Sequence, residues 1–109
     1  AELDRILVRF RTAEDLARDA AAKLQHAGDL RKRQEAQTKQ LAVLRDTGEE
    51  GQERLAVVRE VRRLEAEAGE LERAVAELNM RAHGEREQAR RELLELPGMT
   101  PQAPPGKAP

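Results

Sequence analysis

The stretch VVREVRRLEAEAGELERAVAELNMRA, residues 57–82, decides the fold. Its apolar residues recur at alternating spacings of four and three, which places them on one face of a helix in the a/d pattern of a coiled coil. The residues that hold this spacing are Val57, Val61, Leu64, Ala68, Leu71, Val75, Leu78 and Ala82. We predict that they form a seam, the apolar line along which this helix packs against another helix.

The composition favours long helices over a compact globule. Charged residues make up 38% of the chain, apolar residues including Ala make up 39%, and Phe10 is the single aromatic residue. A globular core depends on large apolar side chains, each of which contributes about 1.5 to 3 kcal/mol when it is buried. A chain dominated by Ala, Glu, Arg and Leu instead has the composition of coiled coils.

The N-terminal half carries a broader apolar stripe. One heptad phase is held by Leu3, Ile6, Phe10, Ala13, Ala17, Ala20, Leu24 and Ala27, and Leu7, Leu16 and Leu30 widen it. Much of this stripe is Ala, which lets helices approach closely but releases little free energy on burial. From Arg31 to Gln40 large apolar side chains are absent, so pairing is expected to be weaker there.

Two breaks divide the chain. Residues 46–52 contain two glycines among polar residues, which is typical of a turn. Pro97 and Gly98 end the second helical stretch, because Pro cannot continue a helix. We therefore predict an all-α fold, a long antiparallel two-helix coiled-coil hairpin with arms 2–46 and 52–96, a turn at 46–52 and a flexible Pro-rich tail at 97–109. Folding near Glu49 brings residue i opposite roughly residue 98 − i and gives arms of about 45 residues each.

Three glycines leave a structural alternative open. Gly28 could split the first arm, and Gly69 or Gly84 could split the second, because each Gly within a helix costs about 1 kcal/mol relative to Ala. The alternative is a bundle of three or four shorter helices. The hairpin is preferred because the seam passes Gly69 without changing phase.

The two arms carry opposite net charges. Residues 1–45 have ten basic and seven acidic groups, and residues 46–96 have nine basic and fourteen acidic groups. The hairpin sets the basic run Arg31, Lys32, Arg33 and Lys39 beside the acidic residues Glu60, Glu65, Glu67, Glu70 and Glu72. Facing charges of this kind select orientation and register, although solvated helix faces would explain the same runs.

The residue types argue against catalysis and against metal or cofactor binding. Ser and Cys are absent, and the two histidines, His26 and His83, are far apart in the sequence. His83 and Glu87 form an i, i+4 pair, but two ligands do not make a metal site. No apolar run approaches the roughly 20 residues that span a bilayer, and residues 1–5 lack the features of a signal peptide. We expect a non-enzymatic protein in the cytoplasm, with no membrane, small-molecule or cofactor partner.

A cluster of large apolar residues is predicted where the first arm begins and the second arm ends. Its members are Leu3, Ile6, Leu7, Phe10, Leu93, Leu94 and Leu96, with Val8 beside them. They exceed what a two-helix seam can bury, and exposed apolar patches mark interfaces. We predict a protein-binding site for a second copy or a larger assembly, so the expected function is a coiled-coil scaffold. The alternative is a small core that stops the helix ends from fraying.

The segment Leu94-Glu95-Leu96-Pro97-Gly98-Met99-Thr100-Pro101, followed by Pro104-Pro105-Gly106, resembles the exit from the N-terminal arm of seryl-tRNA synthetases. In that family a helical hairpin ends in a Leu-Pro segment and grips tRNA. Gly98 stands where the family usually has Asn, and the first arm lacks the family's polar pattern. The resemblance implies an RNA-binding arm as the alternative function. The basic residues Arg31, Lys32 and Arg33 would then be the first candidates for phosphate contact.

Overall fold

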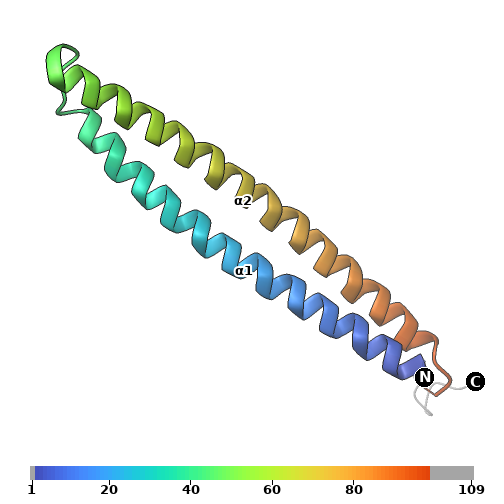
Figure 1. Cartoon of the computed structure of the whole chain (residues 1–109). Helices are drawn as coiled ribbons and strands as arrows, with labels where there is room; N and C mark the ends of the chain where they lie inside the picture. Colours follow the sequence, from blue (N-terminus) through green and yellow to red (C-terminus); the bar gives the residue numbers. More distant parts are fainter. Residues whose placement is uncertain (1, 99–109) are drawn as a thin grey trace, which may run out of the picture. The chain divides into compact units, whose positions relative to one another are not determined.

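The computed structural model describes residues 2–98 and contains two helices, α1 (Glu2–Leu41) and α2 (Gly48–Glu95), with no strand in that range (Figure 1). The predicted all-α hairpin is confirmed. The chain divides into two compact units, each of which holds a segment of both helices. Unit 1 comprises Ala1–Arg18 and Leu78–Pro109, and unit 2 comprises Asp19–Glu77. Of the predicted tail, residues 99–109 lie outside the described residues.

The glycines do not divide the helices. α1 continues through Gly28, and α2 continues through Gly69 and Gly84. The alternative bundle of shorter helices is therefore wrong. The cost of about 1 kcal/mol per glycine is small beside the burial of neighbouring seam residues such as Leu30 and Ala68, which are 3% and 0% exposed.

The turn is built from both helix ends. α1 ends at Leu41, earlier than predicted, and the amides of Ala42, Val43 and Leu44 donate to carbonyl oxygens three residues back at 3.2 to 3.4 Å. This pattern tightens the last turn of a helix. Arg54 of α2 reaches across and donates through Nη1 to the carbonyl oxygen of Leu41 at 2.6 Å. The Leu41 carbonyl oxygen, which also accepts the longer bond from the Leu44 amide, thus gains a second donor from α2.

Two glycines allow the chain to enter α2 earlier than predicted. Gly48 has a φ of 70°, a left-handed conformation that side-chain-bearing residues rarely adopt. Gly51 packs so closely on the backbone of Asp46 that an added Cβ would lie 2.7 Å from the Asp46 carbonyl oxygen. The start of α2 at Gly48 therefore depends on the absence of side chains at both positions.

The predicted seam of α2 is the face that the structure buries. Val57, Leu64, Ala68 and Val75 in unit 2, and Leu78 and Ala82 in unit 1, are at most 9% exposed, whereas Val61 and Leu71 are partly buried. In unit 2, Leu64 and Ala68 form a core cluster with Leu30 of α1, and Leu71 packs against it. Leu30 thus supplies the largest buried side chain of α1 in this unit.

The seam of α1 differs from the predicted one in its second line. The line Ile6, Ala13, Ala20 and Ala27 is buried, as its heptad spacing indicated. Its companion line consists of Arg9, Leu16, Lys23 and Leu30, all partly or fully buried. Leu3 in unit 1 and Leu24 in unit 2 are 50% and 56% exposed, because the apolar stems of charged side chains occupy the line beside Ile6 and Ala20.

Neither α1 nor α2 contains a segment apolar enough, over the length required, to cross a membrane.

Candidate protein-docking surface in unit 1

The seam of unit 1 contains an ion-paired layer. Arg9 of α1 lies 3.2 Å from Glu85 and 3.2 Å from Glu92, both of α2, and the three side chains are 39%, 32% and 30% exposed. Glu85 and Glu92 continue the heptad phase of the α2 seam, where carboxylates would weaken pairing with an apolar helix. Arg9 supplies the complementary charge from the companion line of α1. Sequence reasoning missed this partner, although Arg9 stands seven residues before Leu16 in that line.

The layer also keeps Glu92 ionised. Gln88 donates a hydrogen bond to Glu92 at 3.1 Å, and this bond, together with the positive charge of Arg9, lowers the pKa of the Glu92 carboxyl. A partly buried charged layer is satisfied only when the two helices are in the register that brings its members together. Arg9, Glu85 and Glu92 therefore fix how α1 and α2 pair in unit 1.

An apolar stripe lies beside this layer on α1. Leu3 and Leu7 are 50% and 53% exposed, and Phe10 is half-buried. Spacings of four and three residues place these three side chains on one face of the helix. This face is separate from the buried line of Ile6, which is only 2% exposed.

Leu93 of α2 lies on the same side of unit 1 as Phe10. Phe10 directly follows Arg9, and Leu93 directly follows Glu92, the residue that Arg9 contacts. In antiparallel helices, one step along each chain turns both side chains toward the same face. Leu3, Leu7, Phe10 and Leu93 together are called the docking surface.

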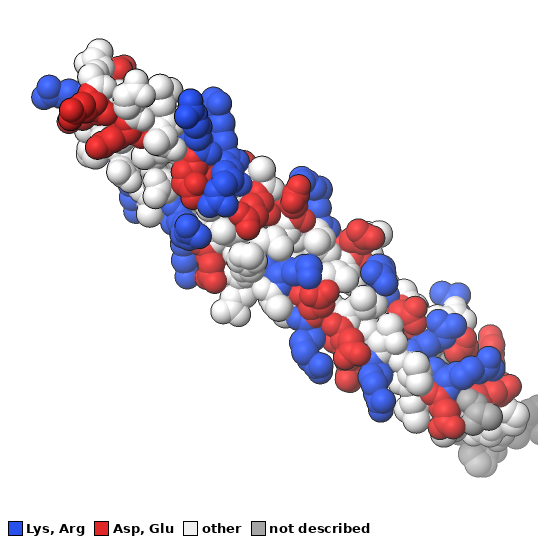
Figure 2. Space-filling model, in the orientation of Figure 1, with Lys and Arg blue, Asp and Glu red and all other residues white. Residues whose placement is uncertain are grey.

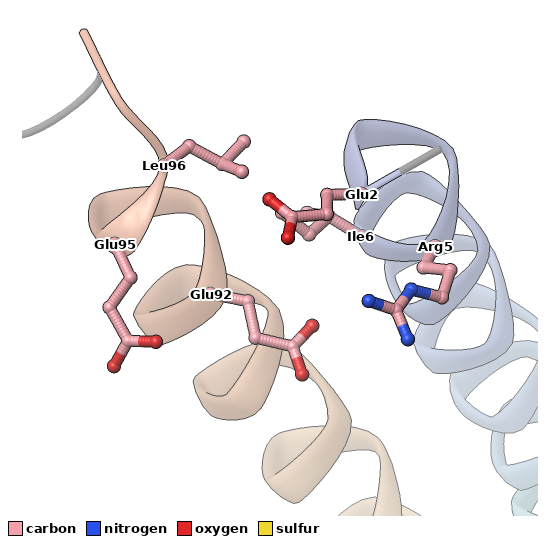
Figure 3. Close-up of a pocket in the computed structure, with 6 residues that line it drawn as sticks. All are labelled: Glu2, Arg5, Ile6, Glu92, Glu95 and Leu96. Atoms are coloured by element: carbon pink, nitrogen blue, oxygen red, sulfur yellow. The ribbon is translucent and has the colours of Figure 1, made fainter.

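The other predicted binding residues are placed differently. Ile6 belongs to the core of unit 1, so it cannot meet a partner directly. Leu94 is 48% exposed and lies about 100° further round α2 than Leu93. Leu96 is half-buried and points toward α1, where it lines a pocket of about 260 Å³ with Ile6 and Arg5 (Figure 3).

Three carboxyl groups and one guanidinium line that pocket. Its remaining lining residues are Glu2, Glu92 and Glu95, and Figure 3 shows Arg5 extending from α1 toward the Glu92 side of the pocket. A general acid or base works best with a pKa near the operating pH, which for a carboxyl requires a shift upward. The pKa of Glu92 is instead shifted downward.

The basic run of α1 is largely neutralised in unit 2. Arg31 donates hydrogen bonds to Glu65 and, at 2.6 Å, to Glu72, and these bonds raise the pKa of its guanidinium above the usual value. Arg33 lies 4.0 Å from Glu60. Lys32 is exposed and forms no ion pair with any residue in the range 2–98. Basic and acidic side chains also alternate on the visible face of each unit (Figure 2).

The histidines lie apart from any candidate ligand cluster. His26 and His83 are exposed. Within the part of the chain that the structure describes, no group of three or more His, Cys, Asp or Glu side chains is arranged to hold a metal ion.

The comparisons with known proteins add no relative. No family model, no curated protein and no solved structure matches this chain.

Proposed function

We propose that this chain is a non-enzymatic coiled-coil module that mediates protein–protein assembly through the docking surface. The observation that carries the proposal is that Leu3 and Leu7 are about half exposed beside the partly buried Phe10 and Leu93. Large apolar side chains that stay together on a water-facing surface favour contact with another protein. Their heptad spacing suits a helical partner.

The remaining polar groups support a structural role. In the seam, Arg9 pairs α1 with Glu85 and Glu92 of α2, whereas Lys23 pairs with Asp19 on α1 itself. The sequence contains neither Ser nor Cys, so the commonest side-chain nucleophiles are missing. The module would then act by presenting a surface, and its helices would hold that surface in place.

RNA binding is the competing function, and the geometry favours it less. Phosphate contact at the basic run would require Arg31 to leave Glu65 and Glu72, or would bring phosphate close to both carboxylates. Like-charge repulsion opposes the second arrangement. The basic run also has no neighbouring aromatic residue for stacking on bases, since the single aromatic residue, Phe10, precedes Arg31 by 21 positions in the sequence.

Site-specific photo-crosslinking tests the proposed function. A photoreactive residue at position 7 is compared with one at position 8 in cells that produce the chain. Val8 is a matched control, because it is 59% exposed and lies on the other side of α1 from Phe10. We expect protein adducts from position 7 and few from position 8. Equal yields at the two positions, or adducts to RNA in place of protein, would overturn the proposal.

A further inference from the structure

Two charges flank the docking surface, one on each helix. Glu14 follows Leu7 by seven residues on α1, and Arg86 precedes Leu93 by seven residues on α2, so each continues an apolar stripe of the docking surface. Neither Glu14 nor Arg86 forms an ion pair with any residue between 2 and 98. Unit 1 therefore presents apolar residues on one face together with an unpaired carboxylate on α1 and an unpaired guanidinium on α2.

We propose that a second copy of this chain occupies the docking surface, related to the first by a two-fold axis that runs parallel to the helices of unit 1. This inference rests on the proposed function and names its partner. The axis places α1 of each copy over α2 of the other. Leu3, Leu7 and Phe10 of one copy then meet Leu93 of the other.

The charges favour this axis over the alternative one. With α1 over α2, Glu14 of each copy comes within about one helical turn of Arg86 of the other, since both lie near the level of the Arg9 layer. A two-fold axis perpendicular to the helices would place α1 over α1 and α2 over α2, which separates Glu14 from Arg86. In a two-fold dimer each contact occurs twice, so complementary charges act at two places.

The apolar contacts give the dimer its affinity, and the charges give it orientation. Leu3 and Leu7 lose contact with water in both copies, and Phe10 and Leu93 complete the burial that unit 1 alone leaves partial. The exposed Glu14 and the half-buried Arg86 contribute mainly to the choice of arrangement. Raising the salt concentration should therefore weaken the dimer only moderately.

Sedimentation equilibrium of the full chain over a range of concentrations tests the inference. We expect a monomer–dimer equilibrium. Its Kd should rise at least about tenfold in Leu7→Glu, because that change buries one carboxylate from each copy in the apolar interface of the dimer. Val8→Glu should leave the Kd within about twofold of the original, since the Val8 side chain lies on the other side of α1 from Phe10. Leu7→Glu exchanges one good helix former for another, and Val8→Glu replaces a weaker helix former, so circular dichroism should show no loss of helix in either variant. Leu3→Glu provides a second variant of the same surface.

Charge reversal separates this dimer from other apolar association. Glu14→Arg and Arg86→Glu should each weaken the dimer, and the double variant should restore the Kd to within about threefold of the original. A chain that stays monomeric at every concentration would overturn the inference. So would a dimer that Val8→Glu and Leu7→Glu weaken equally, or a double variant whose dimer is no tighter than those of the single variants.

If the chain is monomeric but position 7 still forms adducts with a different protein, the second copy is wrong and the proposed function stands. If position 7 forms no protein adducts, the proposed function fails as well.

Discussion

Arg9 and Glu92 lie 3.2 Å apart across the seam of unit 1, in a position where coiled coils usually place apolar residues. The carboxylate of Glu85 lies 3.2 Å from the same guanidinium. A single arginine on α1 thus pairs with two glutamates one heptad apart on α2. Arg31 repeats the arrangement in unit 2 with Glu65 and Glu72, on the flank of the seam.

Removing the seam arginine should destabilise the hairpin. Arg9→Met removes the ion-pair partner of Glu85 and Glu92, which stay partly buried, so the thermal unfolding midpoint should fall. The triple variant Arg9→Met, Glu85→Leu, Glu92→Leu should recover the midpoint of the original chain or exceed it, because apolar residues often replace ion pairs without loss. Circular dichroism melts at neutral pH measure both effects. An unchanged midpoint in Arg9→Met would show that the layer does not contribute.

The Arg31 network should make stability depend on pH in the acid range. Hydrogen bonding by Arg31 lowers the pKa of Glu72, and bonds from Gln34 and Arg31 lower the pKa of Glu65, both from the usual 4.5. A carboxyl group whose pKa is lower in the folded state than in the unfolded state stabilises the fold at pH values above its unfolded-state pKa. This stabilisation is lost as the pH falls through the folded-state pKa. The thermal unfolding midpoint of the original chain should therefore decrease as the pH is lowered below about 4.5. Arg31→Gln should melt earlier at pH 7 and converge with the original chain near pH 2; parallel curves would contradict this.

The burial of α1 gives a direct test of its phase. Leu30 is 3% exposed in the core of unit 2, whereas Leu24 is 56% exposed. Leu30→Ala should lower the free energy of unfolding by about 2 to 4 kcal/mol. Leu24→Ala should change it by less than about 0.5 kcal/mol when measured by urea denaturation at low protein concentration. Equal costs would mean that the second seam line passes through Leu24.

The turn should tolerate no side chain at Gly51. An added Cβ would lie 2.7 Å from the backbone oxygen of Asp46, so Gly51→Ala should cost about 1 to 3 kcal/mol. Gly28→Ala is the matched control, because the space around Gly28 is open and its backbone is helical. That change should stabilise the chain by about 1 kcal/mol. Urea denaturation shows whether each variant raises or lowers the free energy of unfolding. Stabilisation by Gly51→Ala would contradict the close packing of the turn.

The sequence predicted the helices well because periodicity acts locally. The spacing from Val57 to Ala82 identified the buried face of α2, and the two glycines of residues 46–52 located the turn to within a few residues. The turn boundaries differ from the predicted ones: α1 ends at Leu41, whose carbonyl oxygen accepts from Arg54, and α2 begins at Gly48, close to where Gly51 packs on Asp46. These are contacts between residues that local propensity does not relate.

The amino-acid sequence by itself determined the class of fold, the direction of the two helices and the buried face of α2, because each follows from the spacing of apolar residues and from the position of the turn. Only the tertiary structure decided which of two candidate stripes on α1 faces α2. A stripe containing Arg9 and Lys23 is less apolar than one containing Leu3 and Leu24, yet it is the stripe that packs on α2. Arg9 meets Glu85 and Glu92 in unit 1, and Leu30 of the same stripe packs on Leu64 and Ala68 in unit 2. Pairing between charges on two helices depends on register, which neither helix specifies alone.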